Sequence, residues 1–259
     1  MARVSANGVE CYYEAAGAGA PVAFVGDVGY GAWQWGWQHA AVAGPYRSIV
    51  TDLRGSGRSA APPGPYDVPA LVDDFTAVLS DAGVRSAHVV GAGLGGMVAL
   101  EAARTTARVD SLVLVGTAAR GDGLDLEPLW GDPDDPAELE RSLAAGLSEA
   151  FVANHPDAVA QMVEWRGAED ADRAAWEAQA AAVEGFDVAD RLYEITVPSL
   201  VVHGADDAIW PLERGEALAE GLPRGEFRTI EDAGHLVHVE ASKRVNDDLL
   251  GFLASLEDA

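Results

Sequence analysis

Two segments of the sequence carry side chains that could do acid–base chemistry. His235 lies in the Gly-His-Leu segment 234–236, and Asp207 follows the apolar run 199–202. A carboxylate bonded to one imidazole nitrogen fixes the tautomer of a histidine and favours the protonated ring. Such a pair could activate water or remove a proton from a bound molecule. The alternative is a relic pair, whose hydrogen bond only ties two loops together.

A glycine-rich segment, 91–96, reads Gly-Ala-Gly-Leu-Gly-Gly and follows the strand-like residues His-Val-Val at 88–90. It satisfies the G-x-G-x-x-G fingerprint of dinucleotide-binding proteins, in which backbone amides at a helix start bind a pyrophosphate. That interpretation also needs an acidic residue at the end of the next strand to hold a ribose. The strand predicted at 112–115 ends instead in Gly116, so the dinucleotide interpretation is disfavoured.

The same segment also fits G-x-Nuc-x-G, a sharp strand–turn–helix elbow that presents a nucleophile, with Gly93 in the nucleophile position. Such an elbow strains the backbone of its central residue, and glycine adopts the strained conformation at little steric cost. The helix that follows contributes amides and the positive end of its dipole. Gly93 has no side chain, so the position that should attack a substrate is empty.

Apolar runs alternate with helical patterns along most of the chain. Strands are predicted at 22–25, 47–50, 88–90, 111–115, 199–202 and 226–230, with an edge strand at 8–14. Helices are predicted at 33–41, 69–82, 97–103 and 212–218, and a last helix runs through 252. This alternation predicts an α/β fold with a mostly parallel sheet, whose ligands bind beyond the carboxyl ends of the strands.

Residues 120–190 interrupt the alternation. They contain several helix-like stretches, scattered tryptophans and no strand-like apolar run. We therefore predict a core formed by 1–119 and 191–259 and a small helical cap inserted at 120–190. Some cap tryptophans could line an apolar cavity over Gly93.

The formal charge of −25 excludes several classes of partner. A strongly acidic surface repels nucleic acid and anionic membranes, and Lys243 is the only lysine. Carboxylate-rich, lysine-poor surfaces are typical of proteins from high-salt cytoplasms, where salt screens the self-repulsion. No run approaches the roughly 20 apolar residues of a membrane helix, no signal peptide is visible, and Cys11 has no second cysteine to pair with. These features predict a halophile-type cytoplasmic protein.

Several motifs together resemble the α/β-hydrolase-fold family, most closely its enol-lactonase-like members. The segment 52–59 matches the family's loop pattern D-x-R-G-x-G-x-S. The segment 201–207 matches the strand-end motif that contains the acid of the catalytic triad. The segment 233–240 matches the Gly-His motif that contains the general base. The resemblance implies an α/β-hydrolase fold and ester or lactone hydrolysis. It assigns the acid to Asp207, the general base to His235, and the oxyanion amides to Val28 and Leu94.

Two departures from the family pattern fall in the same pocket. The family's elbow usually reads G-H-S-x-G-G, whereas this chain has Gly93 in place of the serine. The family's oxyanion segment usually begins His-Gly, whereas this chain has Gly26-Asp27. We interpret the pair as natural divergence rather than an engineered knockout. Asp27 is then either a substrate-binding or acid–base carboxylate, or a loop cap bonded to backbone amides.

These observations predict a protein of hydrolase ancestry that binds a small, partly apolar molecule. It would act through His235 and Asp207 without a covalent serine intermediate, unless another residue supplies the nucleophile. The alternative is a non-catalytic pseudoenzyme that binds a small molecule in the same cavity. No cysteine or histidine cluster has metal-ligand spacing, so neither a metal nor a cofactor is predicted. Of the other histidines, His203 is expected to be packed and His238 to lie at the surface.

Overall fold

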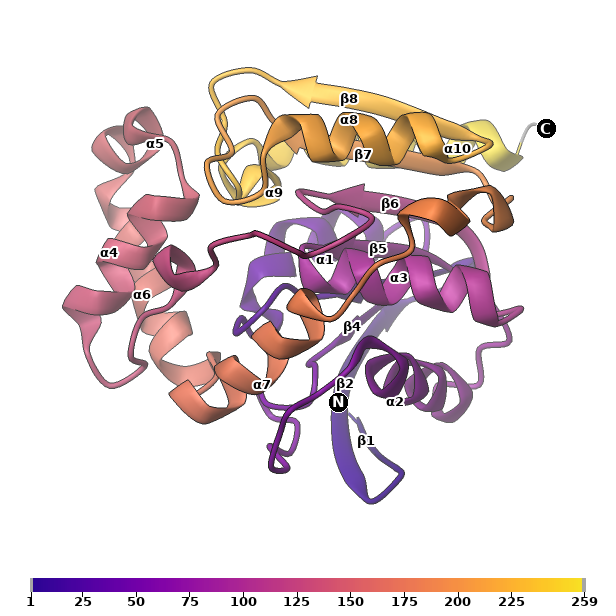
Figure 1. The fold of residues 1–259 in the computed structure, drawn as a ribbon, viewed down its shortest axis with the longest axis horizontal. Helices are drawn as coiled ribbons and strands as arrows, with labels where there is room; N and C mark the ends of the chain where they lie inside the picture. Colours follow the sequence, from indigo (N-terminus) through magenta and orange to yellow (C-terminus); the bar gives the residue numbers. More distant parts are fainter. Residues whose placement is uncertain (1, 258–259) are drawn as a thin grey trace.

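The computed structural model describes residues 2–257, and its centre is an eight-stranded sheet (Figure 1). In chain order the strands are β1 (Ala2–Ala6), β2 (Val9–Gly17), β3 (Pro21–Val25), β4 (Arg47–Thr51), β5 (Ala87–Ala92), β6 (Val109–Val115), β7 (Ser199–Gly204) and β8 (Gly225–Ile230). Their order across the sheet is β1-β2-β4-β3-β5-β6-β7-β8. Strands β3 to β8 pair in parallel, which confirms the predicted mostly parallel α/β sheet.

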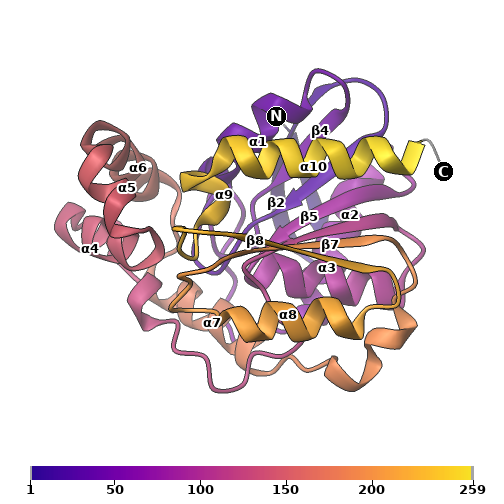
Figure 2. The same cartoon turned by 90° about the horizontal axis from the view of Figure 1, so that it is seen from above.

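Alternate residues of the central strands face two separate hydrophobic cores. Val22 and Phe24 of β3 belong to the core shared with α1 (Gly36–Val42) and α10 (Ser242–Glu257). Ala23 and Val25, one residue out of phase, belong to the core shared with α2 (Val68–Asp81), α3 (Leu94–Thr105) and α8 (Leu212–Gly221). Figure 2 shows α1 and α10 over one face of the sheet and α3 and α8 over the other. Burial on both faces explains why these strands read as continuous apolar runs.

The strand predicted at 8–14 is present as β2, but its predicted position at the edge of the sheet is wrong, because β1 lies outside β2. β1 and β2 pair antiparallel, from Ala2 opposite Tyr13 to Ala6 opposite Val9. β1 is short, and Arg3 and Ser5 are exposed. A five-residue strand with one polar face has too weak an apolar pattern to identify from sequence.

Residues 120–190 leave and re-enter the core at neighbouring points, because Arg120 and Asp187 form an isolated antiparallel bridge. Between them lie η2 (Glu127–Leu129), α4 (Pro136–Gly146), α5 (Glu149–Asn154), α6 (Pro156–Glu169) and α7 (Arg173–Glu184). Helices α4, α5 and α6 stand together at one end of the molecule, to the left in Figure 1. The remaining helical segments are η1 (Ala32–Trp35), η3 (Ala189–Glu194) and α9 (Val237–Glu240). Within residues 2–257, no helix has the length and apolar character needed to cross a bilayer.

The glycine elbow joins β5 directly to α3. Gly93 has φ 46° and ψ −114°, a conformation that side chains with a Cβ rarely adopt. The turn is also tight, since a Cβ on Gly91 would overlap the backbone of Gly95. The helix begins at Leu94, three residues before the predicted start at Met97. The elbow therefore presents the Leu94 amide and the space above Gly93 at the carboxyl edge of the sheet.

Candidate active site

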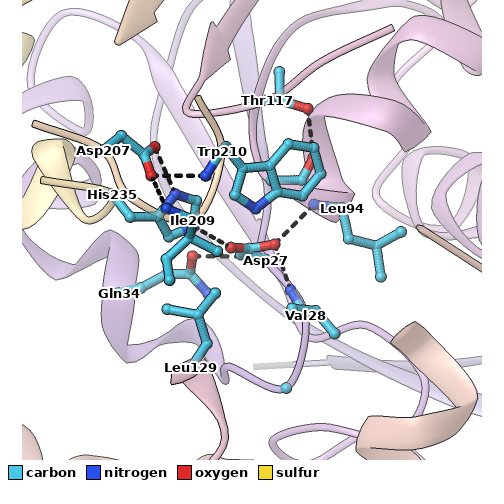
Figure 3. Close-up of polar contacts among 12 residues, drawn as sticks. Asp27, Val28, Gln34, Leu94, Thr117, Leu129, Asp207, Ile209, Trp210 and His235 are labelled. Atoms are coloured by element: carbon cyan, nitrogen blue, oxygen red, sulfur yellow. Dashed lines mark hydrogen bonds and ion pairs between the residues drawn. The ribbon is translucent and has the colours of Figure 1, made fainter. Parts of the chain in front are cut away.

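The carboxyl ends of three parallel strands and one loop meet at a single point above Gly93 (Figure 3). Asp27 and Val28 follow β3, Leu94 follows the elbow after β5, Asp207 follows β7, and His235 lies in the loop after β8. Parallel strands bring their carboxyl ends to the same edge, so residues far apart in sequence become neighbours. The structure thus brings together all the site residues that the sequence analysis named.

The His235 ring is held by Asp207. Its Nδ1 donates a hydrogen bond to Asp207 Oδ2 at 2.9 Å. Asp207 Oδ1 accepts from the amides of Ile209 and Trp210 at 2.9 and 2.8 Å. These two donors were not predicted from the sequence. They form a common type of turn, in which an aspartate side chain accepts hydrogen bonds from the amides two and three residues ahead. The carboxylate is therefore fixed before it orients the imidazole.

The Asp27 carboxylate lies between the His235 ring and the two amides assigned to the oxyanion hole. Its Oδ1 accepts from Val28 N at 2.6 Å and from Leu94 N at 2.8 Å. Its Oδ2 accepts from His235 Nε2 at 2.7 Å. Gln34 Oε1 accepts from the Asp27 amide at 3.2 Å and steadies the loop. The carboxylate thus caps backbone amides, as one interpretation expected, and also contacts the imidazole.

Asp27 and Gly93 fill the same space. A Cβ built on Gly93 would overlap the Asp27 carboxylate, so a side chain at position 93 and this position of Asp27 exclude each other. The register that pairs Val25 with Gly91 sets the distance between the two strand ends. Serine-free chemistry was expected unless another residue placed a nucleophilic group beside His235. The Asp27 carboxylate lies in that position.

His235 is a charged group between two carboxylates. Burial by itself disfavours an imidazolium, but the charge and hydrogen bond of Asp207, followed by those of Asp27, outweigh burial and raise the pKa of His235 to about 10. Burial also raises the pKa of Asp207, but the charge of His235 and hydrogen bonds from His203 and His235 hold that pKa well below its usual range. At neutral pH the site therefore contains an imidazolium beside the Asp207 carboxylate.

This arrangement predicts a loss of stability at alkaline pH. The proton on His235 is held up to about pH 10 in the folded protein but is lost near pH 6.5 when the chain unfolds. The free energy of unfolding should therefore fall between these two pH values, by up to about 5 kcal/mol. Urea unfolding of the wild type and of His235→Gln, compared across that range, measures the difference. Parallel pH profiles for the two proteins would contradict the ion-pair arrangement.

The walls of the site are apolar and closed. Val28, Leu94, Leu129 and Trp210 are buried, and the Asp27 and His235 side chains are 0% and 1% exposed. The Trp210 indole lies parallel to the His235 ring, with 6.2 Å between the ring centroids. Trp210 Nε1 has no acceptor within the part of the chain that the structure describes. A substrate could therefore reach the carboxylate only after a movement of the covering residues.

Residues of the 120–190 segment hold the loop that carries Asp27. Gln179 Oε1 accepts from the Gly29 amide at 2.6 Å, and Ala171 N donates to Gly29 O at 2.8 Å. The Asp170 side chain, 4% exposed, accepts from Arg166 Nε at 2.6 Å. No spacing rule in the sequence would single out Asp170 or Gln179. These contacts connect the cap segment to the loop beside the catalytic candidates.

Other residues singled out in the sequence lie away from the reacting groups. Trp176 packs over Gly29 rather than over Gly93, and Trp165 is partly exposed. His203 is packed as expected, with its Nε2 donating to Trp210 O at 2.7 Å. The surface position predicted for His238 is wrong, because its ring is buried against Trp35 with 4.6 Å between centroids. Burial, and after it the charge of His235, lower the pKa of His238 to about 3.

The geometry argues against a dinucleotide at the elbow. The amide of Leu94, which would bind a pyrophosphate, already donates to a buried carboxylate. A phosphate would have to occupy the space beside that negative charge. Within residues 2–257, no group of three or more His, Cys, Asp or Glu side chains is arranged to hold a metal ion.

Comparisons with known proteins agree on one family. A family model described as alpha/beta hydrolase fold matches residues 29–242. A protein of Azorhizobium caulinodans whose name proposes carbamate hydrolysis is 30% identical over 262 residues, or 96% of both chains. The structure of a thermophilic esterase from Thermogutta terrifontis has a TM-score of 0.81 and 29% identity over 98% of this chain and 99% of its own. The enol-lactonase from Burkholderia xenovorans LB400 has a TM-score of 0.85 over 98% of this chain and 100% of its own, and at 24% identity it supports the fold alone.

Proposed function

Because the chain belongs to the α/β-hydrolase-fold family, we propose that it is a small-molecule hydrolase in which Asp27 acts instead of a serine. The observation that supports this proposal is the set of hydrogen bonds that the Asp27 carboxylate accepts. Oδ1 accepts from the Val28 and Leu94 amides, and Oδ2 accepts from the base, His235. Carboxylates serve as covalent nucleophiles in several enzyme classes. Here the carboxylate reaches the elbow from the neighbouring strand.

In the first step, Asp27 Oδ2 attacks an electrophilic carbon of the substrate and the leaving group departs with the bonding pair. An ester forms at a saturated carbon, and a mixed anhydride forms at an acyl carbon. Oδ1 stays hydrogen-bonded to the two amides, so the carboxylate is oriented before the reaction. Esterification removes the negative charge of Asp27. Since that charge helps to keep His235 protonated, its loss lowers the pKa of the imidazole, and the ring gives up its proton to the leaving group or to solvent.

In the second step, neutral His235 removes a proton from water, which adds to Cγ of the aspartyl ester. Negative charge develops on Oδ1, where the Val28 and Leu94 amides already donate. Collapse of this intermediate expels the product alkoxide, and His235 returns the proton to it. The carboxylic acid that remains gives its proton to His235, which restores the resting carboxylate and imidazolium. Asp207 orients the ring and stabilises its charge throughout.

The second candidate function is a non-catalytic binding protein. One observation favours it: the three charged groups satisfy one another and are buried, so none is free to meet a ligand. In the hydrolase proposal, residues 120–190 form a cap that moves to admit the substrate. In the binding proposal, the ion pairs have only a structural role.

Trapping of the covalent intermediate tests the proposal without knowledge of the natural substrate. His235→Gln removes the base of the second step, so the ester on Asp27 should accumulate and add the substrate's mass to the protein. The variant is incubated in high salt, which suits the acidic surface, with a panel of esters, lactones, carbamates, alkyl halides and epoxides. Intact-protein mass spectrometry detects the adduct, and peptide mapping assigns it to Asp27.

The matched control is Asp27→Asn combined with His235→Gln, which should form no adduct with any compound. An adduct of equal mass in this control would refute Asp27 as the nucleophile. If neither protein forms an adduct and the wild type consumes no compound, the binding proposal is favoured.

A further inference from the structure

We propose that residues 124–130 form a strap that opens to admit small molecules to the closed site, and that Arg173 of α7 holds this strap shut through Glu127. The strap contains η2, and Figure 3 shows its Leu129 among the side chains that surround Asp27. The proposal concerns access to the site, so it applies to the hydrolase and to the binding protein alike.

The strap lies against the loop that follows the candidate nucleophile. Leu129 and Trp130 share the lining of one small internal cavity with Gly29 and Tyr30. Gly29 and Tyr30 come two and three positions after Asp27 in the chain. Leu129 is buried in this position. Outward movement of the strap would therefore uncover this loop and open a way toward the carboxylate.

Few polar contacts attach the strap to the rest of the protein. Among the described residues outside it, apart from a turn bond to the neighbouring Gly121, only two side chains hydrogen-bond to it. Arg166 Nη2 donates to Leu129 O at 3.3 Å, and Arg173 binds Glu127. A groove of about 420 Å³ also lies between the start of the strap and α7. The strap can therefore move without breaking a backbone ladder.

The helices on either side of the strap are bound to the catalytic loops instead. Gln179 of α7 accepts from the Gly29 amide at 2.6 Å, two positions after the candidate nucleophile. Gly146, the last residue of α4, accepts at its carbonyl oxygen from Leu236 N at 2.7 Å, one position after the candidate base. Movement of α4 or α7 would displace both catalytic candidates. Movement of the strap leaves them in place, so the strap is the part of the cover suited to a gate.

Arg173 joins the strap to α7 through two kinds of contact. Its Nη1 and Nη2 donate to the two carboxylate oxygens of Glu127 at 2.9 and 2.5 Å, a fork that fixes the carboxylate in one orientation. Its guanidinium also lies over the rings of Trp130 and Trp176, at 5.3 and 4.9 Å from their centroids. Its Nε donates to Glu177 Oε1 within α7 at 2.8 Å. One cation thus holds an acid and an aromatic ring of the strap.

This latch is exposed to solvent and should respond to salt. The side chains of Arg173 and Glu127 are 43% and 55% exposed, and salt screens ion pairs at such positions. The strap should therefore open more often as the salt concentration rises. The fold as a whole should respond in the opposite direction, because screening reduces the self-repulsion of a chain with a formal charge of −25.

Hydrogen exchange at the His235 ring tests the proposal without a substrate. Both ring N–H groups are buried against carboxylates, so they exchange with solvent only when the site opens. NMR measures this rate beside that of the Val113 amide in β6, which reports global unfolding. We expect Arg173→Gln and Glu127→Gln each to accelerate His235 exchange at least about fivefold and to leave Val113 unchanged. The double variant should exchange no faster than Arg173→Gln alone, because both substitutions break one contact.

Glu177→Gln is the matched control. It removes an ion pair of Arg173 within α7 but no contact with the strap, so His235 exchange should stay within about twofold of the wild type. An increase from about 0.2 M to about 2 M KCl should accelerate His235 exchange and slow Val113 exchange in the wild type, and Arg173→Gln should lose the first effect.

Two results would overturn the proposal. The first is equal His235 exchange in the wild type and Arg173→Gln, which would show that the ion pair does not hold the strap. The second is a His235 rate equal to the Val113 rate in every protein, which would show that the site opens only by global unfolding. Because no step of the reaction enters this measurement, the strap and the aspartate nucleophile are tested independently. Circular dichroism and the unfolding midpoint check the fold of each variant.

Discussion

Asp27→Asn is expected to lower turnover by about 10³-fold or more, with little change in the folded structure. The amide keeps an oxygen for the Val28 and Leu94 amides, but it cannot accept the His235 hydrogen bond in the same way and is a far weaker nucleophile. Turnover of any compound that the wild type consumes measures the effect. A loss below about tenfold would contradict a covalent role for Asp27.

The same variant has a readout that needs no substrate. The charge and hydrogen bond of Asp27 both raise the pKa of His235, so their removal should lower it from about 10. Titration of the imidazole by NMR measures this shift directly. Asp206→Asn is the matched control, because Asp206 is exposed and adjacent to the triad acid. It should change neither the titration nor the turnover.

The second large effect is a gain of serine esterase activity in the double variant Asp27→Gly with Gly93→Ser. Removal of the carboxylate frees the Val28 and Leu94 amides, and the new hydroxyl occupies the vacated space beside His235. A burst of nitrophenol from p-nitrophenyl butyrate should appear, at a rate at least about 100-fold above either single variant. Stopped-flow absorbance in high salt measures the burst.

The single variants are the controls for this gain. Gly93→Ser alone should be destabilised by about 1–3 kcal/mol, because its Cβ overlaps the Asp27 carboxylate and its backbone is left-handed. Asp27→Gly alone has free amides but no nucleophile. The stability and activity changes should therefore be strongly non-additive. Additive effects, or a burst in Gly93→Ser alone, would show that the two positions do not compete for space.

Much of the fold and several site residues could be predicted because they depend on local patterns. Buried parallel strands read as apolar runs. Asp207 and His235 could be identified because they lie in recognisable motifs just after β7 and in the loop after β8. The helical segment 120–190 was recognisable by its lack of such runs. Strand β1 was missed because its few apolar residues alternate with exposed polar ones.

The partnership of Asp27 with His235 could not be predicted in the same way. Both departures, Gly93 and Asp27, were assigned to one pocket, but they lie 66 positions apart in the chain. Whether the carboxylate reaches the imidazole depends on the register of β3 against β5 and on one side-chain rotamer. His238 was misplaced for a related reason, since a polar side chain becomes buried only when distant segments cover it.

The mutual exclusion of the Asp27 carboxylate and a side chain at position 93 has a historical consequence. If the ancestor had a serine at the elbow, an aspartate arriving first at position 27 would have had to take another rotamer, away from the Val28 and Leu94 amides. Loss of the serine first meets no steric obstacle. The carboxylate could therefore reach its present position only after position 93 had lost its side chain.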